Sequence, residues 1–219
     1  MITPFLNPNF LKITLMSLLR KMFGPFKDDV WRQLADEISA DFVDGGFWKG
    51  SKVQASVNEW TVTLDTHTVS TGKVYIVYTR MRAPYVNKDG FRFKIYRKGV
   101  FSNLGKRLGM QDIEVGFPDF DDQFVIQGND EHKLHRLFEN PTIRQLIEAQ
   151  PAISLEVKDD DGWFAARFPE GVDLLSFKVI GVIKDIAQLK MLYGLFAETL
   201  DQLCRIGSAY EDDPNVALK

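Results

Sequence analysis

Apolar and polar side chains alternate with a period of two at the start of the segment from Val53 to Lys98. This period places the apolar side chains of a strand on one face, so that face is buried and the other meets water or a partner. Two strands are therefore predicted. Their apolar sets are Val53, Ala55 and Val57 in the first and Trp60, Val62 and Leu64 in the second.

Two further strands follow, over Val74–Arg82 and Phe91–Lys98, and both are rich in the β-branched and aromatic residues that suit a half-buried sheet. Thr71-Gly72 and Asn87–Gly90 separate the strands and are typical of turns. Because parallel neighbours need a long crossover, connections this short predict an antiparallel meander of about four strands.

Helices are predicted on both sides of this meander. Residues Lys27–Phe42 carry apolar side chains every four positions, which indicates an amphipathic helix. A strand over Phe124–Gln127 precedes a helix capped by Asn129 or Asp130, and Pro141 suits the first turn of the next helix. The chain therefore mixes strands and helices along its length.

The last predicted element is a helix from about Asp185 to Ile206, with Gly207 as its C-terminal cap. Its apolar side chains fall at steps of three and four and form a seam about three heptads long. The seam residues are Ile186, Leu189, Tyr193, Phe196, Leu200 and Leu203. The seam either covers the apolar face of the sheet or pairs two copies of the chain. Residues 208–219 are predicted to form a disordered tail.

A hairpin is predicted where Ile153–Lys158 and Trp163–Phe168 flank the turn Asp159–Gly162. The turn begins like a calcium loop, but it lacks the glutamate that such loops carry at their last position. A solvated hairpin tip is the simpler interpretation.

The N-terminal residues 1–24 are strongly apolar, but the segment is too short to span a bilayer and lacks the features of a secretory signal. A helix over residues 10–23 is predicted. It either docks on the core or on a second subunit, or it lies on a membrane surface. The residues predicted to make this membrane or partner contact are Phe10, Leu15, Leu18, Leu19 and Phe23.

Composition is ordinary for a globular domain, with 219 residues, 45% of them hydrophobic and 26% charged. At this length, one domain over residues 25–207 is the simplest organisation. The single cysteine, Cys204, cannot form an internal disulfide and suits a reducing cytoplasm. A cytoplasmic location, with or without membrane association, is the expectation.

Charge is distributed unevenly along the chain. The stretch from Arg80 to Arg107 holds nine Lys or Arg against one acid, a net +8, while the whole chain carries −3. Arginine forks beside tyrosines suit phosphate or carboxylate groups, so the stretch predicts a patch for an anionic ligand or an anionic membrane surface. The alternative is a solvated sheet face whose charges pair with acidic helices. The patch residues are Arg80, Arg82, Arg92, Lys94, Arg97 and Lys98. Nucleic acid is not an expected partner, because the rest of the chain is acidic.

No reactive centre stands out. His132 and His135 lie three positions apart, whereas zinc hydrolases place two histidines four apart around a glutamate, so surface histidines are the simpler interpretation. Cys204 has no histidine near it in the sequence and is interpreted as a half-buried structural thiol. No catalytic residue, cofactor or metal is expected.

The middle of the chain resembles a bacterial family of uncharacterised domains. The resemblance covers approximately residues 115–180 and rests on Phe120–Ile126, the acidic helix start Asp130-Glu131 and the helix break Asn140-Pro141. Members of that family are often membrane-associated, with spans ahead of the domain. This chain departs from them, because it has only the short segment over residues 10–23. The resemblance implies no reaction and no catalytic residue.

Together these patterns predict an α+β fold: an antiparallel curved sheet or partial barrel of about six to eight strands, with the long C-terminal helix packed on it. The expected function is a non-enzymatic binding or interaction domain, peripheral to the cytoplasmic membrane through an anionic surface or a protein contact. A partner protein or a homodimer is expected to use the helix over residues 10–23 or the C-terminal helix. The alternative is an enzyme or small-molecule carrier with a cavity between the sheet and the C-terminal helix.

Overall fold

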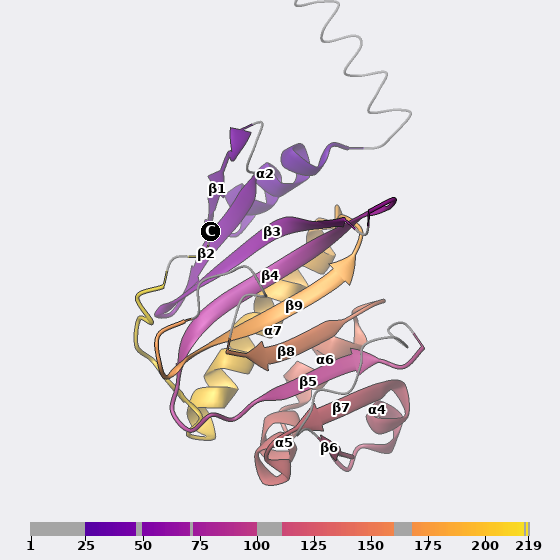
Figure 1. Cartoon of the computed structure of the whole chain (residues 1–219), viewed down its shortest axis with the longest axis vertical. Coiled ribbons are helices and arrows are strands. Elements are labelled where there is room, and N and C mark those ends of the chain that lie inside the picture. The colour runs from indigo at the N-terminus through magenta and orange to yellow at the C-terminus, as the bar shows by residue number, and fades with distance from the viewer. Residues whose placement is uncertain are drawn as a thin grey trace, which may run out of the picture.

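A computed structural model describes residues 25–46, 50–70, 72–99, 111–159, 168–216 and 218. Its strands form one antiparallel, curled sheet in the order β1-β2-β3-β4-β9-β8-β5-β7-β6, with β10 paired to β4 (Figure 1). The strands are β1 (Asp41–Val43), β2 (Lys52–Val57), β3 (Trp60–Ser70), β4 (Tyr75–Asn87), β5 (Phe93–Arg97), β6 (Gln111–Asp112), β7 (Phe124–Gly128), β8 (Ser154–Lys158), β9 (Val172–Ile180) and β10 (Ala209–Tyr210). The predicted α+β class and curved antiparallel sheet are confirmed, and this sheet of ten strands is larger than predicted.

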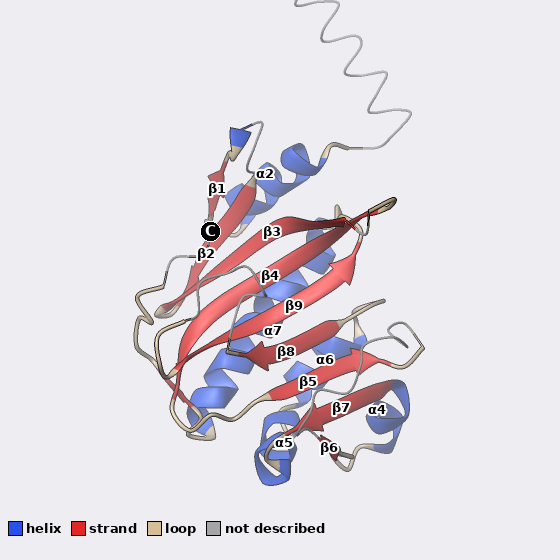
Figure 2. Ribbon diagram, in the orientation of Figure 1, coloured by secondary structure: helices blue, strands red, loops and turns tan. Residues whose placement is uncertain are grey.

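Helices accompany the sheet, and the longest of them runs behind the central strands (Figures 1 and 2). The described helices are α2 (Lys27–Glu37), α4 (Pro118–Gln123), α5 (Glu131–Phe138), α6 (Pro141–Glu148) and α7 (Ile186–Arg205). Both α2 and α6 pack against α7. One side of the sheet is thus closed by a helical layer.

The hydrophobic core lies between α7 and the sheet. Leu189, Phe196 and Leu203 on α7 are buried, as are Met81 on β4 and Phe177 on β9 across from them. The Tyr193 hydroxyl donates a hydrogen bond of 3.4 Å to the Val53 carbonyl of β2. The predicted packing of the C-terminal helix on the apolar sheet face is therefore confirmed.

The predicted four-strand meander is only partly correct. Strands β2, β3 and β4 pair in sequence order, as the short turns indicated. Strand β5 does not pair with β4, because β9 and β8 lie between them and pair with β4 and β5 respectively. The short connection after Asn87 reverses the chain direction, so β4 and β5 run antiparallel. They are separated by two strands that come from a later part of the chain.

Strand β9 is the central element that the sequence analysis missed. It pairs with β4 on one side and β8 on the other, and residues Val172–Phe177 are buried throughout. Leu175, Phe177 and Val179 of β9 belong to the core, but apolar Val172, Leu174 and Ile180 occupy alternate positions of the strand, so its period of two is weak. The first strand of the predicted 153–168 hairpin corresponds to β8, whose partner is β9. The predicted second strand, Trp163–Phe168, falls almost wholly outside the described residues.

The first described helix is shorter than predicted. Helix α2 ends at Glu37, and the amide of Ala40 donates to the carbonyl of Ala35 as Ser39 takes a left-handed conformation with φ of 54°. Phe42 was predicted to lie on this helix, but it belongs to β1 and pairs with Val53. Phe42 has the spacing of a helix residue but lies in the sheet, because the left-handed Ser39 ends the helix before Phe42 is reached.

Helix starts follow the sequence closely. The carboxylate of Asp130 accepts from the amide of Lys133 at the start of α5, and Asn140 and Asp185 cap α6 and α7 in the same way. At the end of α7, Gly207 has φ of 78°, as predicted for its cap. The disordered tail predicted from residue 208 begins instead with β10, which pairs with Val86 and Asn87 of β4.

Candidate functional site

The face of the sheet turned away from α7 carries a row of polar residues across eight strands. Their register is continuous from β2 to β6: Gln54, Thr63, Arg82, Ser176, Glu156, Lys94, Gln127 and Asp112. Several members contact each other, as where the Gln54 amide donates to the Thr63 hydroxyl at 3.3 Å. This polar face contains part of the predicted basic patch.

Two patch arginines share one carboxylate on this face. Arg80 donates to both oxygens of Asp65 at 2.8 Å, and Arg82 donates to Asp65 Oδ2 at 2.5 Å. Arg82 is only 1% exposed. A guanidinium taken out of water needs a charged partner, and the pairing with Asp65 supplies it. These two arginines hold β3 and β4 together and are not a free anion site.

Arg92 lies at the other end of the sheet and has acidic partners of its own. Its guanidinium donates to both oxygens of Asp173 at 3.1 Å and to Asp159 at 2.9 Å. The Asn87 side chain also donates to Asp173 and to the carbonyl of Phe91. This cluster fixes the connection between β4 and β5, and Asp159 takes part in it through an ion pair.

The remaining patch residues also bind within the fold. The ammonium of Lys94 lies 3.8 Å from Glu156 on the neighbouring strand. The guanidinium of Arg97 donates to Gln123 and to the carbonyls of Glu148 and Gln150, and the Lys98 ammonium donates to a carbonyl of α4. The structure therefore divides the six cations of the predicted patch among separate internal contacts.

The other candidates for chemistry serve the fold. Nδ1 of His135 lies 3.2 Å from the carbonyl of Val115, and the described residues contain no group of His, Cys, Asp and Glu arranged for a metal. Burial, with the carboxylates of Glu211 and Asp201 nearby, raises the pKa of the Cys204 thiol to about 11. A thiol with this pKa stays protonated near neutrality and is a poor nucleophile. The N-terminal contact residues Phe10 to Phe23 lie outside the described residues.

The space between the sheet and α7 is filled by side chains. Met81, Phe177, Leu192, Phe196 and Leu200 are fully buried there and belong to one continuous core. A carrier or an enzyme with its site in this layer needs an open volume. In the part of the chain that the structure describes, this layer is a packed interior.

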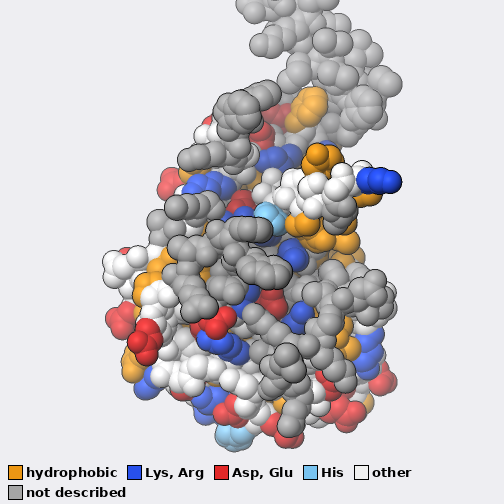
Figure 3. Space-filling view, viewed as in Figure 1, with side chains coloured by type: hydrophobic (Ala, Val, Ile, Leu, Met, Phe, Trp, Pro, Cys, Tyr) orange, Lys and Arg blue, Asp and Glu red, His pale blue; other side chains and the backbone are white. Residues whose placement is uncertain are grey.

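An exposed hairpin end is a feature that the sequence analysis did not single out. Residues 66–70 of β3 and 75–79 of β4 pair with each other and project past the start of β2, and residues 75–77 also project past the end of β9 (Figure 1). We call residues 66–70 and 72–79 the arm. Its exposed apolar side chains include Val74 at 56% and Tyr75 at 74%, and Ile180 at the end of β9 is 65% exposed. Figure 3 shows apolar side chains gathered on this projecting part.

Basic groups border the apolar end of the arm. The register places His67, Tyr78 and Ile180 side by side, and the Lys178 ammonium lies 4.8 Å from the Tyr78 ring centroid. Lys73 is exposed at the tip, and the sequence from Thr66 to Arg80 contains no acid. Partial burial, and then the cation of Arg80, hold the pKa of His67 below its usual value. The carboxylate of Asp65 acts in the opposite direction, and Lys178 adds to the lowering.

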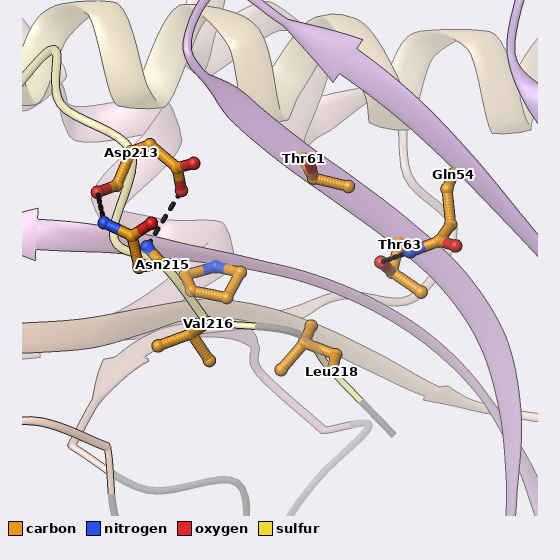
Figure 4. Close-up of a pocket in the computed structure, with 8 residues that line it drawn as sticks. Gln54, Thr61, Thr63, Asp213, Asn215, Val216 and Leu218 are labelled. Atoms are coloured by element: carbon orange, nitrogen blue, oxygen red, sulfur yellow. Dashed lines mark hydrogen bonds between the residues drawn. The ribbon is translucent and has the colours of Figure 1, made fainter.

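A second surface feature is a groove of about 370 Å³ on the polar face, between strands β2 to β4 and the C-terminal segment. Gln54, Thr61 and Thr63 line its strand side, and Val216 and Leu218 face them from the C-terminal segment (Figure 4). Sequence reasoning missed the groove, because residues 211–215 are polar or proline and the two aliphatic residues that follow, Val216 and Leu218, are too few to indicate an element.

Comparisons with known proteins give one distant structural neighbour. No family model and no curated protein matches the chain. The crystal structure of the mycobacterial trehalose monomycolate transport factor A, TtfA, is 10% identical in sequence, with a TM-score of 0.48 over 81% of this chain and 94% of that one. The resemblance of residues 115–180 to a bacterial domain family stays a prediction.

Proposed function

We propose that the protein is a non-enzymatic binding module that attaches to an anionic membrane surface at the cytoplasmic side, through the arm. The observations that support this proposal are that exposed Val74 and Tyr75 follow Lys73 in the arm, and that exposed Ile180 pairs with Tyr78, whose ring lies 4.8 Å from the Lys178 ammonium. Aromatic and aliphatic side chains next to lysines suit the boundary between acyl chains and anionic headgroups. The relevant cations in this proposal are thus Lys73 of the arm and Lys178 of β9 beside it, and not the paired arginines of the predicted patch.

The N-terminal segment joins the fold at the base of the arm. At the start of α2 the Lys27 ammonium donates to the Ser51 side chain, and the neighbouring Gly50 packs beside the hydroxyl of Thr66 in the arm. Farther along the helix, the Trp31 indole donates at 3.1 Å to the carbonyl of Ile183, whose amide donates to Thr79 of the arm. The apolar residues 1–24 therefore precede a point close to the arm. Because the described chain begins near the arm, the proposal includes a contribution of residues 1–24 to the same attachment.

The described helices do not themselves offer a membrane crossing, since none combines sufficient length with sufficient hydropathy. A peripheral attachment needs only a few inserted side chains and nearby cations. The exposed end of the arm meets this requirement. The packed core and the internally paired arginines supply the rigid support behind it.

Replacing Tyr75 and Ile180 together by serine is expected to weaken binding to anionic vesicles roughly tenfold or more, because each loses apolar contact area at the membrane boundary. The measurement is co-sedimentation of the full chain with vesicles of phosphatidylcholine containing about one third phosphatidylserine. Tyr210→Ser is the matched control. Tyr210 is also exposed, at 43%, but it pairs at the opposite end of β4.

A second full-length variant, Leu18→Asp with Leu19→Asp, measures the share of the N-terminal segment in the same assay. The proposal predicts losses for the arm variant and retention for the Tyr210 control. Wild-type binding that is absent, equally strong on pure phosphatidylcholine, or unchanged in the arm variant would contradict attachment through the arm.

Binding to the same vesicles is expected to strengthen as the pH falls below about 6.5, because protonated His67 adds a charge worth about 1 kcal/mol beside an anionic surface. Without vesicles, the same drop in pH is expected to lower the stability of the fold. A histidine with a lowered pKa contributes stability above its unfolded pKa and loses it as the pH falls through the folded value. His67→Gln should flatten both dependences, measured by sedimentation and by thermal melting. A pH dependence of binding that is unchanged in His67→Gln would exclude this histidine as its source.

A further inference from the structure

The C-terminal segment crosses the polar face of the sheet after a firm anchor. Strand β10 pairs with Val86 and Asn87 of β4, and the amide of Lys88 donates to the carbonyl of Ser208 at 3.0 Å. The ammonium of Lys88 also lies 5.0 Å from the Tyr210 ring centroid. The chain direction is thus set at Tyr210, and the described residues Asp213, Asn215, Val216 and Leu218 line the groove beside β2 to β4.

Beyond Tyr210 the described residues contact the sheet through side chains and no longer through strand pairing. The hydrogen bonds of residues 211–218 within the described chain are the two between Asp213 and Asn215. Val216 and Leu218 line the groove against Pro84 and the two threonines of β3, and Leu218 is only 9% exposed. The segment is therefore seated by aliphatic side chains and lacks strand pairing past β10.

The groove has the properties of a peptide site. Gln54 and Thr63 hydrogen-bond to each other in its wall, and the exposed hydroxyl of Thr61 lines it together with the ring of Pro84, so it can bind a backbone group and pack an aliphatic side chain. The spacing of Val216 and Leu218 by two residues places both side chains on one side of an extended chain.

We propose that the strand side of this groove, formed by Gln54, Thr61, Thr63 and Pro84, is a docking site for an extended peptide segment of a partner protein with two aliphatic residues spaced by two, and that Val216 and Leu218 of the C-terminal segment cover it in cis and can be displaced. A segment tethered at β10 has an effective concentration of about 1 mM at the groove. For a peptide with a dissociation constant of about 100 µM, this competition lowers the apparent affinity roughly tenfold.

The test uses the full chain and a fluorescein-labelled peptide with the sequence of residues 211–219. Binding is followed by fluorescence anisotropy with the wild-type chain and with Leu218→Asp, in which the charged side chain leaves the groove. The labelled peptide should bind Leu218→Asp roughly tenfold or more tightly than the wild type. A peptide that itself carries aspartate in place of Leu218 should not bind.

Two substitutions on β3 locate the site within the Leu218→Asp background. Thr61→Arg fills the groove from an exposed position and should reduce peptide affinity roughly tenfold, whereas Thr68→Arg, exposed on the same strand but outside the groove, should leave it unchanged. Circular dichroism and a thermal melt verify folding of each variant. Equal binding to wild type and Leu218→Asp, no binding to a folded Leu218→Asp, or equal effects of both arginines would overturn the proposal.

Discussion

Asp65→Ala is expected to lower the free energy of unfolding by about 3–5 kcal/mol, the loss typical of breaking a buried ion pair from one side. Asp65 accepts from both Arg80 and Arg82, and Arg82 is 1% exposed. Removal of the carboxylate leaves two guanidinium groups next to each other with their shared anion gone. The destabilisation comes mainly from the buried cation that remains, and urea denaturation monitored by tryptophan fluorescence measures it.

A double variant separates this cause from simple loss of side-chain packing. Replacing Arg82 by methionine in the Asp65→Ala background removes the buried charge, so part of the lost stability should return. Asp36→Ala is the matched control, since Asp36 is exposed on α2, and its effect should stay within about 0.5 kcal/mol. An Asp65→Ala effect as small as that of Asp36→Ala would mean that the arginines are solvated and available to a ligand.

Phe196→Ala is expected to lower the free energy of unfolding by about 3–5 kcal/mol as well, through lost burial and the cavity left behind. Phe196 is fully buried on the seam of α7, against the apolar face of the sheet. The sheet side of this layer is formed by central strands, so the gap cannot close without moving β4 or β9. The same urea titration gives the change in midpoint.

The control for this helix is Lys190→Ala, an exposed change on α7. Lys190 lies 2.6 Å from Glu37, and an exposed pair of this kind contributes less than about 1 kcal/mol. A Phe196→Ala variant as stable as Lys190→Ala would show that the layer between sheet and helix has room to spare. That result would favour the carrier or enzyme alternative over a binding module with a packed interior.

The two surfaces proposed for binding are separate on the molecule and make separate predictions. The arm joins an exposed apolar end to lysines, while the groove lies under the C-terminal segment on the polar face. Variants of Tyr75 and Ile180 should not change peptide affinity, and Leu218→Asp should not change vesicle binding. The rigid part between them is the sheet whose arginines are internally paired.

The local elements were predictable from the sequence because each depends on nearby residues. The alternation after Val53, the seam of α7, the cap at Asp130 and the helix start at Pro141 all act within one strand or a few helical turns. The same local patterns indicated the α+β class and the helix-covered sheet. They failed at Phe42, where a left-handed Ser39 ended the helix before the apolar spacing did.

The tertiary structure alone decided the strand order and the role of the basic stretch. Strand β9 inserts next to β4, and its Asp173 reaches Arg92 across 81 positions of sequence, as Asp65 reaches Arg82 across 17. Ion pairs form between the strands that become neighbours in the sheet. The order of the strands depends on contacts between distant parts of the chain, and no local period in the sequence encodes it. For this physical reason the six cations predicted to form a surface patch make separate internal contacts in the fold.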